Sequence, residues 1–420
     1  MKLKVFVLLF LINIALVSKA NYILLPMDES QTNHLKSYGF TYKVLDLGVE
    51  VEWLLNYRGG SFCFAYSKTF LDSLLIKGIK YEILSDANHA SIVASIASPE
   101  QNMDVMKLQK APKIAVYSPK SKLPWDDAVT MALSYAEIPY TVIFDDEVMG
   151  DELVKYDWLH LHHEDFTGQY GKFYSSYSTQ FWYQQQQKEF EESALKHGFA
   201  KVSQLKLAIV HKIRDFTASG GFLFAMCSAT DTYDIALAAE GVDICAQMFD
   251  GDDSDPNAQN KLDFSKTFAF KNFQLKPNPY EYEYSTIDMQ MGERGLGETN
   301  DYFSLFTFSA KWDPVPTMLT QNHTQTIHGF MGQTTSFRKE MIKSEIVILG
   351  ENESVGEVRY LHGTIGKGFF TFYGGHDPED YQHFVGEEPT DLNLHPNSAG
   401  YRLILNNILF PAAKKKERKT

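Results

Sequence analysis

The chain of 420 residues carries 53 acidic and 39 basic side chains, a formal net charge of −14, and 44% of its residues are hydrophobic. That hydrophobic content is ordinary for a globular protein, and the length suffices for a large core or two domains. The acidic balance excludes nucleic acid as a partner, because phosphates and carboxylates repel each other. The sequence contains no interaction motif, so it leaves the oligomeric state open.

The first 20 residues read as a secretory signal peptide. Lys2 and Lys4 form a basic flank, residues 5–17 form an apolar run, and Ser18-Lys19-Ala20 is a small-x-small cleavage site. This run is too short for a transmembrane helix, and no later apolar run is long enough to span a bilayer. We therefore predict an exported protein, periplasmic or extracellular, without a membrane span.

Residues 21–110 are predicted to form an N-terminal α/β lobe, with a polar linker at 98–112. Apolar runs and helical periodicity alternate along this part of the chain. Such alternation favours a mostly parallel sheet with helices on both faces. The expected strands are 22–27, 49–57 and 80–84, and the expected helices are 32–47, 70–77 and 89–96.

A second α/β series is predicted over residues 111–413, followed by a basic tail at 414–420. Insertions near 167–200 and 249–333 interrupt the series, and insertions of this size tend to decorate the ligand end of an α/β scaffold. The expected strands are 113–117, 140–144, 158–162, 221–226 and 368–373, and the expected helices are 126–136, 205–217 and 401–409.

Cys227 follows a short apolar strand and precedes a helical pattern. Open α/β sheets bind their ligands at this carboxyl end of the strands. Ala225 and Ala229, two residues to either side, are small, as a sharp strand-to-helix nucleophile elbow requires. The alternative is a buried structural cysteine, because free cysteine is among the most buried residue types.

His376 follows a second apolar strand that ends in Gly374-Gly375. A cysteine nucleophile needs a base, and a carboxylate that orients the imidazole; Asp377 and Glu379 are the candidates. The alternative is a turn histidine.

A third polar group follows the strand at 158–162. His160 and His162 point the same way along a strand, and His163, Glu164 and Asp165 lie past its end. Together with Ser228, next to the cysteine, the residues from His162 to Asp165 are predicted to line the pocket. A metal site that includes His160 and His162 is the weaker alternative, because no spaced metal-binding motif supports it.

The Gly-Gly-strand-cysteine elbow, the piece Phe372-Tyr373-Gly374-Gly375-His376-Asp377-Pro378-Glu379 and the helix at 401–409 resemble the class I glutamine-amidotransferase-like superfamily, and especially its trehalose-utilisation-protein branch. This resemblance implies a flavodoxin-like, doubly wound, mostly parallel sheet. It also implies Cys227 as nucleophile, His376 as base and Glu379 as orienter, with no cofactor. Asp377 is one residue more than the family's His-Pro-Glu pattern has, and it becomes a rival to Glu379.

The whole chain also resembles an exported Bacteroidota family labelled asparagine synthetase B, through stretches such as 25–28, 53–60, 159–165 and 391–397. An enzyme of that name would have a catalytic cysteine directly after the initiator methionine and a Ser-Gly-Gly-x-Asp-Ser loop that binds ATP. Here position 2 is Lys2 and no such loop occurs, so the chemistry of that label is not predicted. The sequence instead predicts an amidotransferase-like hydrolase that acts on an amide or related acyl bond of a small-molecule or carbohydrate-like substrate. The alternatives are a non-catalytic ligand-binding module and a metal-dependent hydrolase.

Overall fold

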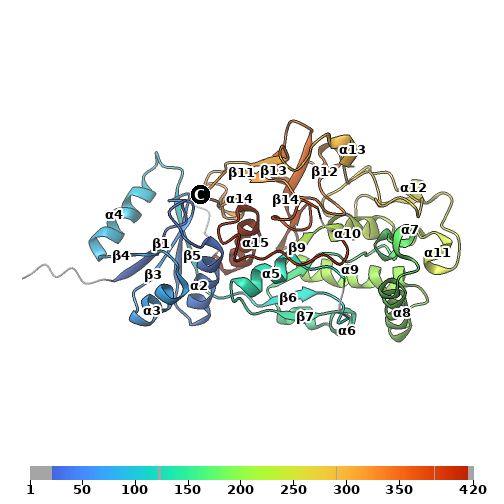
Figure 1. Ribbon diagram of the computed structural model, residues 1–420, viewed down its shortest axis with the longest axis horizontal. Helices are drawn as coiled ribbons and strands as arrows, with labels where there is room; N and C mark the ends of the chain where they lie inside the picture. Colours follow the sequence, from blue (N-terminus) through green and yellow to red (C-terminus); the bar gives the residue numbers. More distant parts are fainter. Residues whose placement is uncertain (1–20, 122–123, 290, 383, 415–420) are drawn as a thin grey trace, which may run out of the picture.

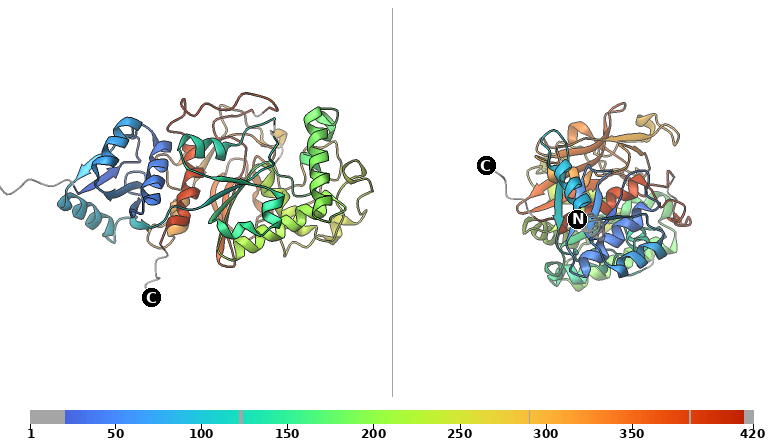
Figure 2. Two further views of the ribbon diagram at one scale, coloured as in Figure 1. Left: turned by 90° about the horizontal axis from the view of Figure 1, so that it is seen from below. Right: turned by 90° about the vertical axis from the view of Figure 1, so that its left-hand side faces the viewer.

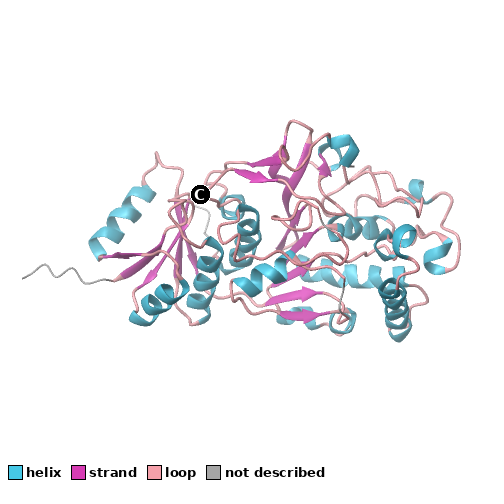
Figure 3. Ribbon diagram, in the orientation of Figure 1, coloured by secondary structure: helices cyan, strands magenta, loops and turns pink. Residues whose placement is uncertain are grey.

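The structure is a computed structural model that describes residues 21–121, 124–289, 291–382 and 384–414. Two β-sheets lie side by side along the length of the molecule, with helices packed around them (Figures 1 and 3). The predicted signal peptide and residues 415–420 of the predicted tail lie outside the described residues. Within the described part, no helix is long and apolar enough to cross a membrane.

The N-terminal lobe is a five-stranded sheet in the order β4-β1-β3-β2-β5, and all of its pairings are antiparallel. The prediction of a mostly parallel lobe is therefore wrong. Residues 56–60 form a tight turn in which Asn56, Arg58, Gly59 and Gly60 have positive φ, so β2 returns directly as β3 without a helical crossover. The strands are β1 (Tyr22–Leu25), β2 (Val51–Leu55), β3 (Ser61–Ala65), β4 (Glu82–Leu84) and β5 (Asp104–Leu108).

Two features of this lobe were not predicted. The strand β3 was missed, and the expected linker at 98–112 contains β5, which pairs with β2 as an edge strand. The three expected helices are present as α2 (His34–Asp46), α3 (Lys68–Lys77) and α4 (Asp86–Ala97).

The larger sheet has ten strands, and it is parallel in one half and antiparallel in the other. The parallel strands lie in the order β7-β6-β8-β9-β15. Their bounds are β6 (Ile114–Tyr117), β7 (Thr141–Ile143), β8 (Trp158–Leu161), β9 (Phe222–Met226) and β15 (Gly368–Tyr373). The five expected strands of the second series are thus confirmed.

The antiparallel half was not predicted, and part of it comes from the 249–333 insertion. The sheet continues from β15 through β14, β13, β10 and β11, and β12 pairs with β14. These strands are β10 (Tyr302–Leu305), β11 (Thr326–His328), β12 (Phe337–Arg338), β13 (Val347–Asn352) and β14 (Glu357–Ile365).

Helices cover both faces of the parallel half, so its strands are buried on both sides. Along β8, Trp158 belongs to one hydrophobic core, while Leu159 and Leu161 belong to the other. The first core includes α5 (Ala128–Tyr135) and α15 (Ala399–Leu409), and the second includes α9 (Val202–Ala218) and α10 (Ser228–Ala238). Burial on both faces explains why these strands read as continuous apolar runs in the sequence.

Helix α15 joins the two sheets. It lies between them in Figures 1 and 2, and it contacts both α2 and α5. Arg402 of α15 is fully buried, and it donates hydrogen bonds to the carbonyl of Met27 (2.8 Å) and to the hydroxyl of Tyr38 (3.1 Å). The remaining helices lie mostly in the insertions or at the sheet ends: α6 (Asp145–Met149), α7 (Tyr174–Tyr177), α8 (Phe181–Lys196), α11 (Gln247–Asp250), α12 (Ala258–Lys261), α13 (Met291–Arg294) and α14 (Pro314–Leu319).

Candidate active site

Cys227 lies at the sharp turn between β9 and α10, as predicted. Its backbone has φ 52° and ψ −141°, a region that non-glycine residues rarely adopt and that surrounding structure must enforce. Two backbone hydrogen bonds do so. The N–H of Cys227 donates to the carbonyl of Gly375 (3.2 Å), and the N–H of Ala229 donates to the carbonyl of His162 (3.0 Å). The turn is therefore tied to the ends of both neighbouring strands.

Three histidines surround this cysteine. One ring nitrogen each of His162, His163 and His376 and the Sγ of Cys227 all lie within 4.8 Å of one another. The His162 and His163 rings stack with centroids 4.0 Å apart, and each lies 4.7 Å from the ring of His376. We call these four residues the donor cluster. The carboxyl ends of β8, β9 and β15 thus meet at one point, as the sequence predicted.

Oxygen acceptors hold the imidazoles of the donor cluster. The Nε2 of His376 lies 2.9 Å from Oδ1 of Asp126, and the Nε2 of His163 lies 2.7 Å from the carbonyl of Asp126. The Nδ1 of His162 lies 3.3 Å from Oδ2 of Asp127. The contacts of His163 and His376 are hydrogen bonds that fix the orientation of those two rings, whereas the contact of His162 with Asp127 is not a hydrogen bond.

Asp126 takes the place that the sequence reasoning gave to Glu379 or Asp377. The Oε2 of Glu379 lies 3.1 Å from Nδ1 of His395 instead. The carboxylate of Asp377 accepts the N–H of Glu379 (2.9 Å), and burial raises the pKa of Asp377 to about 6. The orienting carboxylate of His376 is therefore on the loop after β6.

Asp126 and Asp127 were missed because they read as the start of a helix. Asp127 is indeed the N-cap of α5, since its carboxylate accepts the N–H of Thr130 at 2.8 Å. The signal that could have found them is topological. The loop after β6 opens at the same sheet edge as the ends of β8 and β9.

The other predicted site residues lie around the donor cluster in different roles. Both ring nitrogens of His160 are engaged, with Oδ2 of Asp127 and the carbonyl of Phe224, each at 3.2 Å. Glu164 accepts the N–H of His162 (2.9 Å), and burial raises its pKa to about 7. Asp165 accepts backbone N–H groups of Thr167, Gln169 and Gly171, so it organises the following loop.

Burial keeps two members of the donor cluster, Cys227 and His163, uncharged. Burial raises the pKa of the Cys227 thiol to about 11, although the N–H groups of Gln333, Ser228 and Thr334 hydrogen-bond to it and lower that pKa. Burial and the neighbouring imidazoles hold the pKa of His163 well below its usual range. At neutral pH the cysteine is therefore a thiol, and His163 is uncharged.

The loop at 330–336 brings Gln333 and Thr334 to Cys227. It packs directly on the end of β15: a Cβ on Gly332 would lie only 2.7 Å from the backbone nitrogen of His376. The N–H of His376 also donates to the carbonyl of Met331 (2.7 Å). Glycine is thus required at position 332 for the loop to approach the site this closely.

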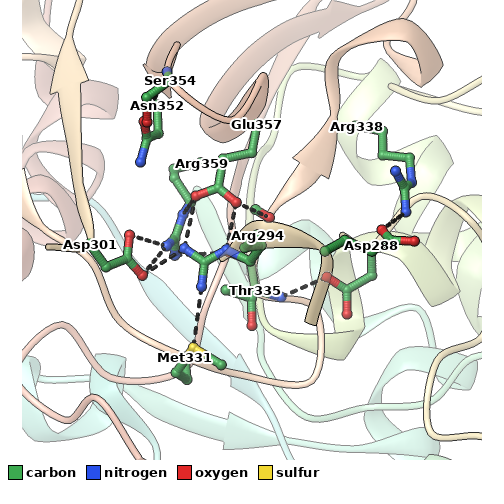
Figure 4. A network of polar contacts seen from close by, with 12 residues as sticks. Asp288, Arg294, Asp301, Met331, Thr335, Arg338, Asn352, Ser354, Glu357 and Arg359 are labelled. Carbon is green, nitrogen blue, oxygen red and sulfur yellow. Dashed lines mark hydrogen bonds and ion pairs between the residues drawn. The ribbon is translucent and has the colours of Figure 1, made fainter. Parts of the chain in front are cut away.

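A buried set of charges lies behind this loop (Figure 4). We call Arg294, Asp301, Glu357 and Arg359 the ionic cluster; all four side chains are shielded from solvent. Arg294 and Arg359 each contact both carboxylates, at distances of 2.6 to 2.9 Å. Two positive and two negative charges therefore balance within one compact group.

The ionic cluster anchors both ends of the loop. Nη1 of Arg359 donates to the carbonyls of Phe330 (2.7 Å) and Thr335 (3.2 Å), and Ser336 donates to Glu357 (2.9 Å). Gln333 and Thr334, whose N–H groups hydrogen-bond to the Cys227 sulfur, lie between these anchors. The ionic cluster thus positions the backbone that faces the thiol.

Aromatic side chains cover the donor cluster. The ring of Trp125 lies 5.5 Å from that of His163, 5.4 Å from Phe173 and 5.3 Å from Trp182. Tyr282 lies 5.9 Å from Phe173. Both insertions therefore contribute to this cover, and beneath it Cys227 is only 4% exposed.

No family model and no curated protein matches the chain. Among solved structures, it is similar to the cytoplasmic proteins STM3548 and STM1381 of Salmonella typhimurium, at 10% and 12% identity and TM-scores of 0.34 and 0.35, each covering 72% of this chain and 100% of the other. It is also similar to Gan42B, a GH42 β-galactosidase of G. stearothermophilus, at 10% identity and a TM-score of 0.29 over 64% of this chain and 28% of that one. At such low TM-scores these likenesses carry no argument about fold or function.

Proposed function

We propose that the protein is an exported hydrolase that cleaves an amide or related acyl bond with the thiol of Cys227. His376 acts as the proton shuttle, and Asp126 orients it. The observation that carries the proposal is one arrangement: a thiol on a strand-to-helix turn, an imidazole nitrogen within 4.8 Å of it, and a carboxylate 2.9 Å from Nε2 of that imidazole. A nucleophile, a base and an orienter in this order form the general triad.

The proposed steps follow from the resting state. Because the pKa of the thiol is about 11, its proton passes to His376 as the sulfur–carbon bond forms. His376 then gives the proton to the leaving amine as the carbon–nitrogen bond breaks. Water hydrolyses the thioester and restores the thiol. Backbone N–H groups at the start of α10 would stabilise the oxyanion, because the amino end of a helix favours negative charge.

The fold assignment and the family are part of the proposal. The order β7-β6-β8-β9-β15 is 2-1-3-4-5 in chain order, which supports a flavodoxin-like doubly wound unit. The elbow at Cys227 and the histidine after β15 support a place in the class I amidotransferase-like superfamily, near its trehalose-utilisation branch. Export rests on the signal-peptide pattern, and a mature N-terminus at Asn21 would support it.

The substrate class follows from the cover. Trp125, Phe173 and Tyr282 offer flat apolar faces beside the donor cluster, and such faces suit a small or carbohydrate-like molecule. Because Cys227 is almost fully covered, substrate entry requires this aromatic cover to move.

The test is to trap an acyl group on the sulfur. The mature protein is mixed with a panel of p-nitroanilide amides and p-nitrophenyl esters, quenched in acid and analysed by mass spectrometry. We expect an acyl adduct on Cys227, and Cys227→Ala should lower turnover by about 10³-fold or more. Cys245→Ser is the matched control, because that buried thiol bonds the carbonyl of Thr167 at 3.2 Å, away from the triad.

A non-catalytic binding module is the second candidate, and the burial of the Cys227 thiol favours it. Alkylation separates the two. An active thiol should react with iodoacetamide faster than Cys63, whose pKa burial raises to about 12, and His376→Gln should slow that reaction. A folded protein in which no probe acylates Cys227 and His376→Gln changes nothing would establish the binding module instead.

A further inference from the structure

We propose that the donor cluster binds a divalent transition-metal ion such as Zn²⁺, and that the bound ion silences the Cys227 nucleophile. The metal site rests on geometry alone, and the regulatory role rests on the proposed function. The site comprises His162, His163, Cys227 and His376, which the ends of three neighbouring strands bring together.

The donor set suits such an ion. Three imidazoles and one thiolate are borderline-soft ligands of the kind that Zn²⁺ takes in tetrahedral sites. Ligand atoms on a tetrahedral zinc ion lie about 3.3–3.8 Å apart, given bonds of about 2.0–2.3 Å. The four donor atoms already lie within 4.8 Å of one another, so small side-chain rotations would complete the coordination.

The surroundings of the histidines are those of metal ligands. A ligating histidine usually donates its other ring N–H to a carboxylate or a backbone carbonyl, which fixes its orientation. Here Asp127 faces His162, the carbonyl of Asp126 faces His163, and the carboxylate of Asp126 faces His376. His163 and His376 thus have the hydrogen-bonded outer partner that is usual for metal ligands, and the carboxylate of Asp127 lies 3.3 Å from Nδ1 of His162.

An independent observation points to a missing partner. His162 is 1% exposed, and within the described residues its Nε2 makes no hydrogen bond. A buried polar atom without a partner is rare and calls for an explanation. Nδ1 of the same ring also makes no hydrogen bond within the described residues, although it lies 3.3 Å from Oδ2 of Asp127, so a ligand at the donor cluster would satisfy a ring nitrogen that now lacks a partner.

A second group of possible metal ligands is already occupied by a cationic side chain. Asp243, Cys245 and Asp250 also lie close together, but the Nζ of Lys201 lies 2.5 Å from Asp243 and 3.0 Å from Asp250. A lysine ammonium already supplies the cation there.

Metal binding would switch off the proposed chemistry. The Cys227 thiol releases its proton to solvent, and the sulfur lone pair forms a bond to the ion, so the sulfur is no longer available to attack a carbonyl. His376 is ligated at the same time, so the base is lost as well. Removal of the ion by a chelator frees the imidazole and lets the sulfur take up a proton to restore the thiol.

Cobalt titration tests the site without any assay of turnover. The mature protein is stripped with a chelator and titrated with Co²⁺, whose bond to a thiolate gives a charge-transfer band in the near ultraviolet. We expect one equivalent to bind, the band to vanish in Cys227→Ser, and the band to remain in Cys245→Ser. Asp127→Asn keeps an N-cap for α5 and should weaken Co²⁺ binding by about 10- to 100-fold.

The outcomes separate the site from the proposed function. A cobalt–thiolate band together with no acyl adduct would support the site and defeat only the hydrolase. An acyl adduct in a protein that gives no band, or a band that survives in Cys227→Ser, would overturn the metal site. Zn²⁺ should block iodoacetamide labelling and hydrolysis, with recovery in a chelator; hydrolysis that rises with Zn²⁺ would overturn the inhibitory role.

Discussion

The ionic cluster and the donor cluster lie on opposite sides of the loop at 330–336, and both are buried polar groups. In the ionic cluster, charges balance and each side chain has charged partners at 2.6 to 2.9 Å. In the donor cluster, the thiol is uncharged and the Nε2 of His162 has no hydrogen-bond partner among the described residues. A satisfied cluster has no capacity left for a ligand, whereas an unsatisfied one does. The first cluster therefore stabilises the fold, whereas the second is the one for which we propose chemistry.

The largest effect is expected from breaking the ionic cluster. Arg359→Met leaves Asp301 and Glu357 buried with one cation fewer, which should lower the free energy of unfolding by about 3–5 kcal/mol. Urea unfolding followed by circular dichroism measures this. The control is Arg338→Met, whose partner Glu293 is half-exposed, and it should cost under about 1 kcal/mol.

A milder variant covers the case in which Arg359→Met does not fold. Ser336→Ala removes only the hydroxyl that donates to Glu357, and it should cost about 1–2 kcal/mol. Equal effects of Arg359→Met and Arg338→Met would mean that the ionic cluster contributes no more than a surface pair.

The two clusters also differ in how far the sequence could reveal them. The elbow at Cys227 and the histidine after β15 are local patterns, a short apolar run followed by a functional side chain, and both were predicted. Asp126 could not be assigned from such a pattern, because its role depends on the loop after β6 meeting the end of β15. The ionic cluster consists of four charged residues between positions 294 and 359. Charged residues usually lie on the surface, and no local pattern in the sequence shows that these four are buried together.

In the N-terminal lobe, too, local features were predicted and long-range ones were not. Its helices and most of its strands were predicted, since apolar periodicity is local. The direction of strand pairing was not, because it depends on the turn at 56–60, where four residues adopt positive φ. The expected strand at 49–57 included Asn56 and Tyr57, so the start of this turn was read as the end of a strand.

One substitution at Glu357 should show that the ionic cluster depends on charge. Burial raises the pKa of Glu357, but the hydrogen bond from Arg294 and the charges of both arginines lower it to about 2. The folded pKa lies below the ordinary value near 4.5, so its stabilisation is present above pH 4.5 and is lost as the pH falls through 2. Glu357→Gln should therefore cost about 3 kcal/mol at pH 7, and the difference from the wild type should shrink between pH 4.5 and pH 2 in urea titrations.

Replacing a buried carboxyl by an amide beside the donor cluster should raise the free energy of unfolding, whereas Glu357→Gln lowers it. Burial raises the pKa of Asp231 to about 7, although Thr334 donates a hydrogen bond to it at 2.8 Å. The folded pKa lies above the ordinary value near 3.8, so stability is lost as the pH rises from 3.8 through 7. Asp231→Asn should gain about 2–4 kcal/mol relative to the wild type over that range. The prediction is contradicted if the difference in unfolding free energy between Asp231→Asn and the wild type does not change with pH in urea titrations. That result would mean that folding does not raise the pKa of Asp231.

The smallest effect concerns the backbone of the donor cluster rather than its side chains. Cys227 adopts φ 52° and ψ −141°, where a Cβ is unfavourable by about 1–3 kcal/mol and glycine is not. Glycine also makes the unfolded chain more flexible, which returns about 0.4–1 kcal/mol. Cys227→Gly should therefore be more stable than Cys227→Ala by about 1 kcal/mol in urea unfolding. Ala229→Gly, two residues into α10, is the control of opposite sign, because glycine inside a helix costs about 1 kcal/mol. If the glycine variant were the less stable one at both positions, the backbone at Cys227 would be unstrained. The hydrogen bonds from Cys227 to Gly375 and from Ala229 to His162 would then not be needed to hold Cys227 in this conformation.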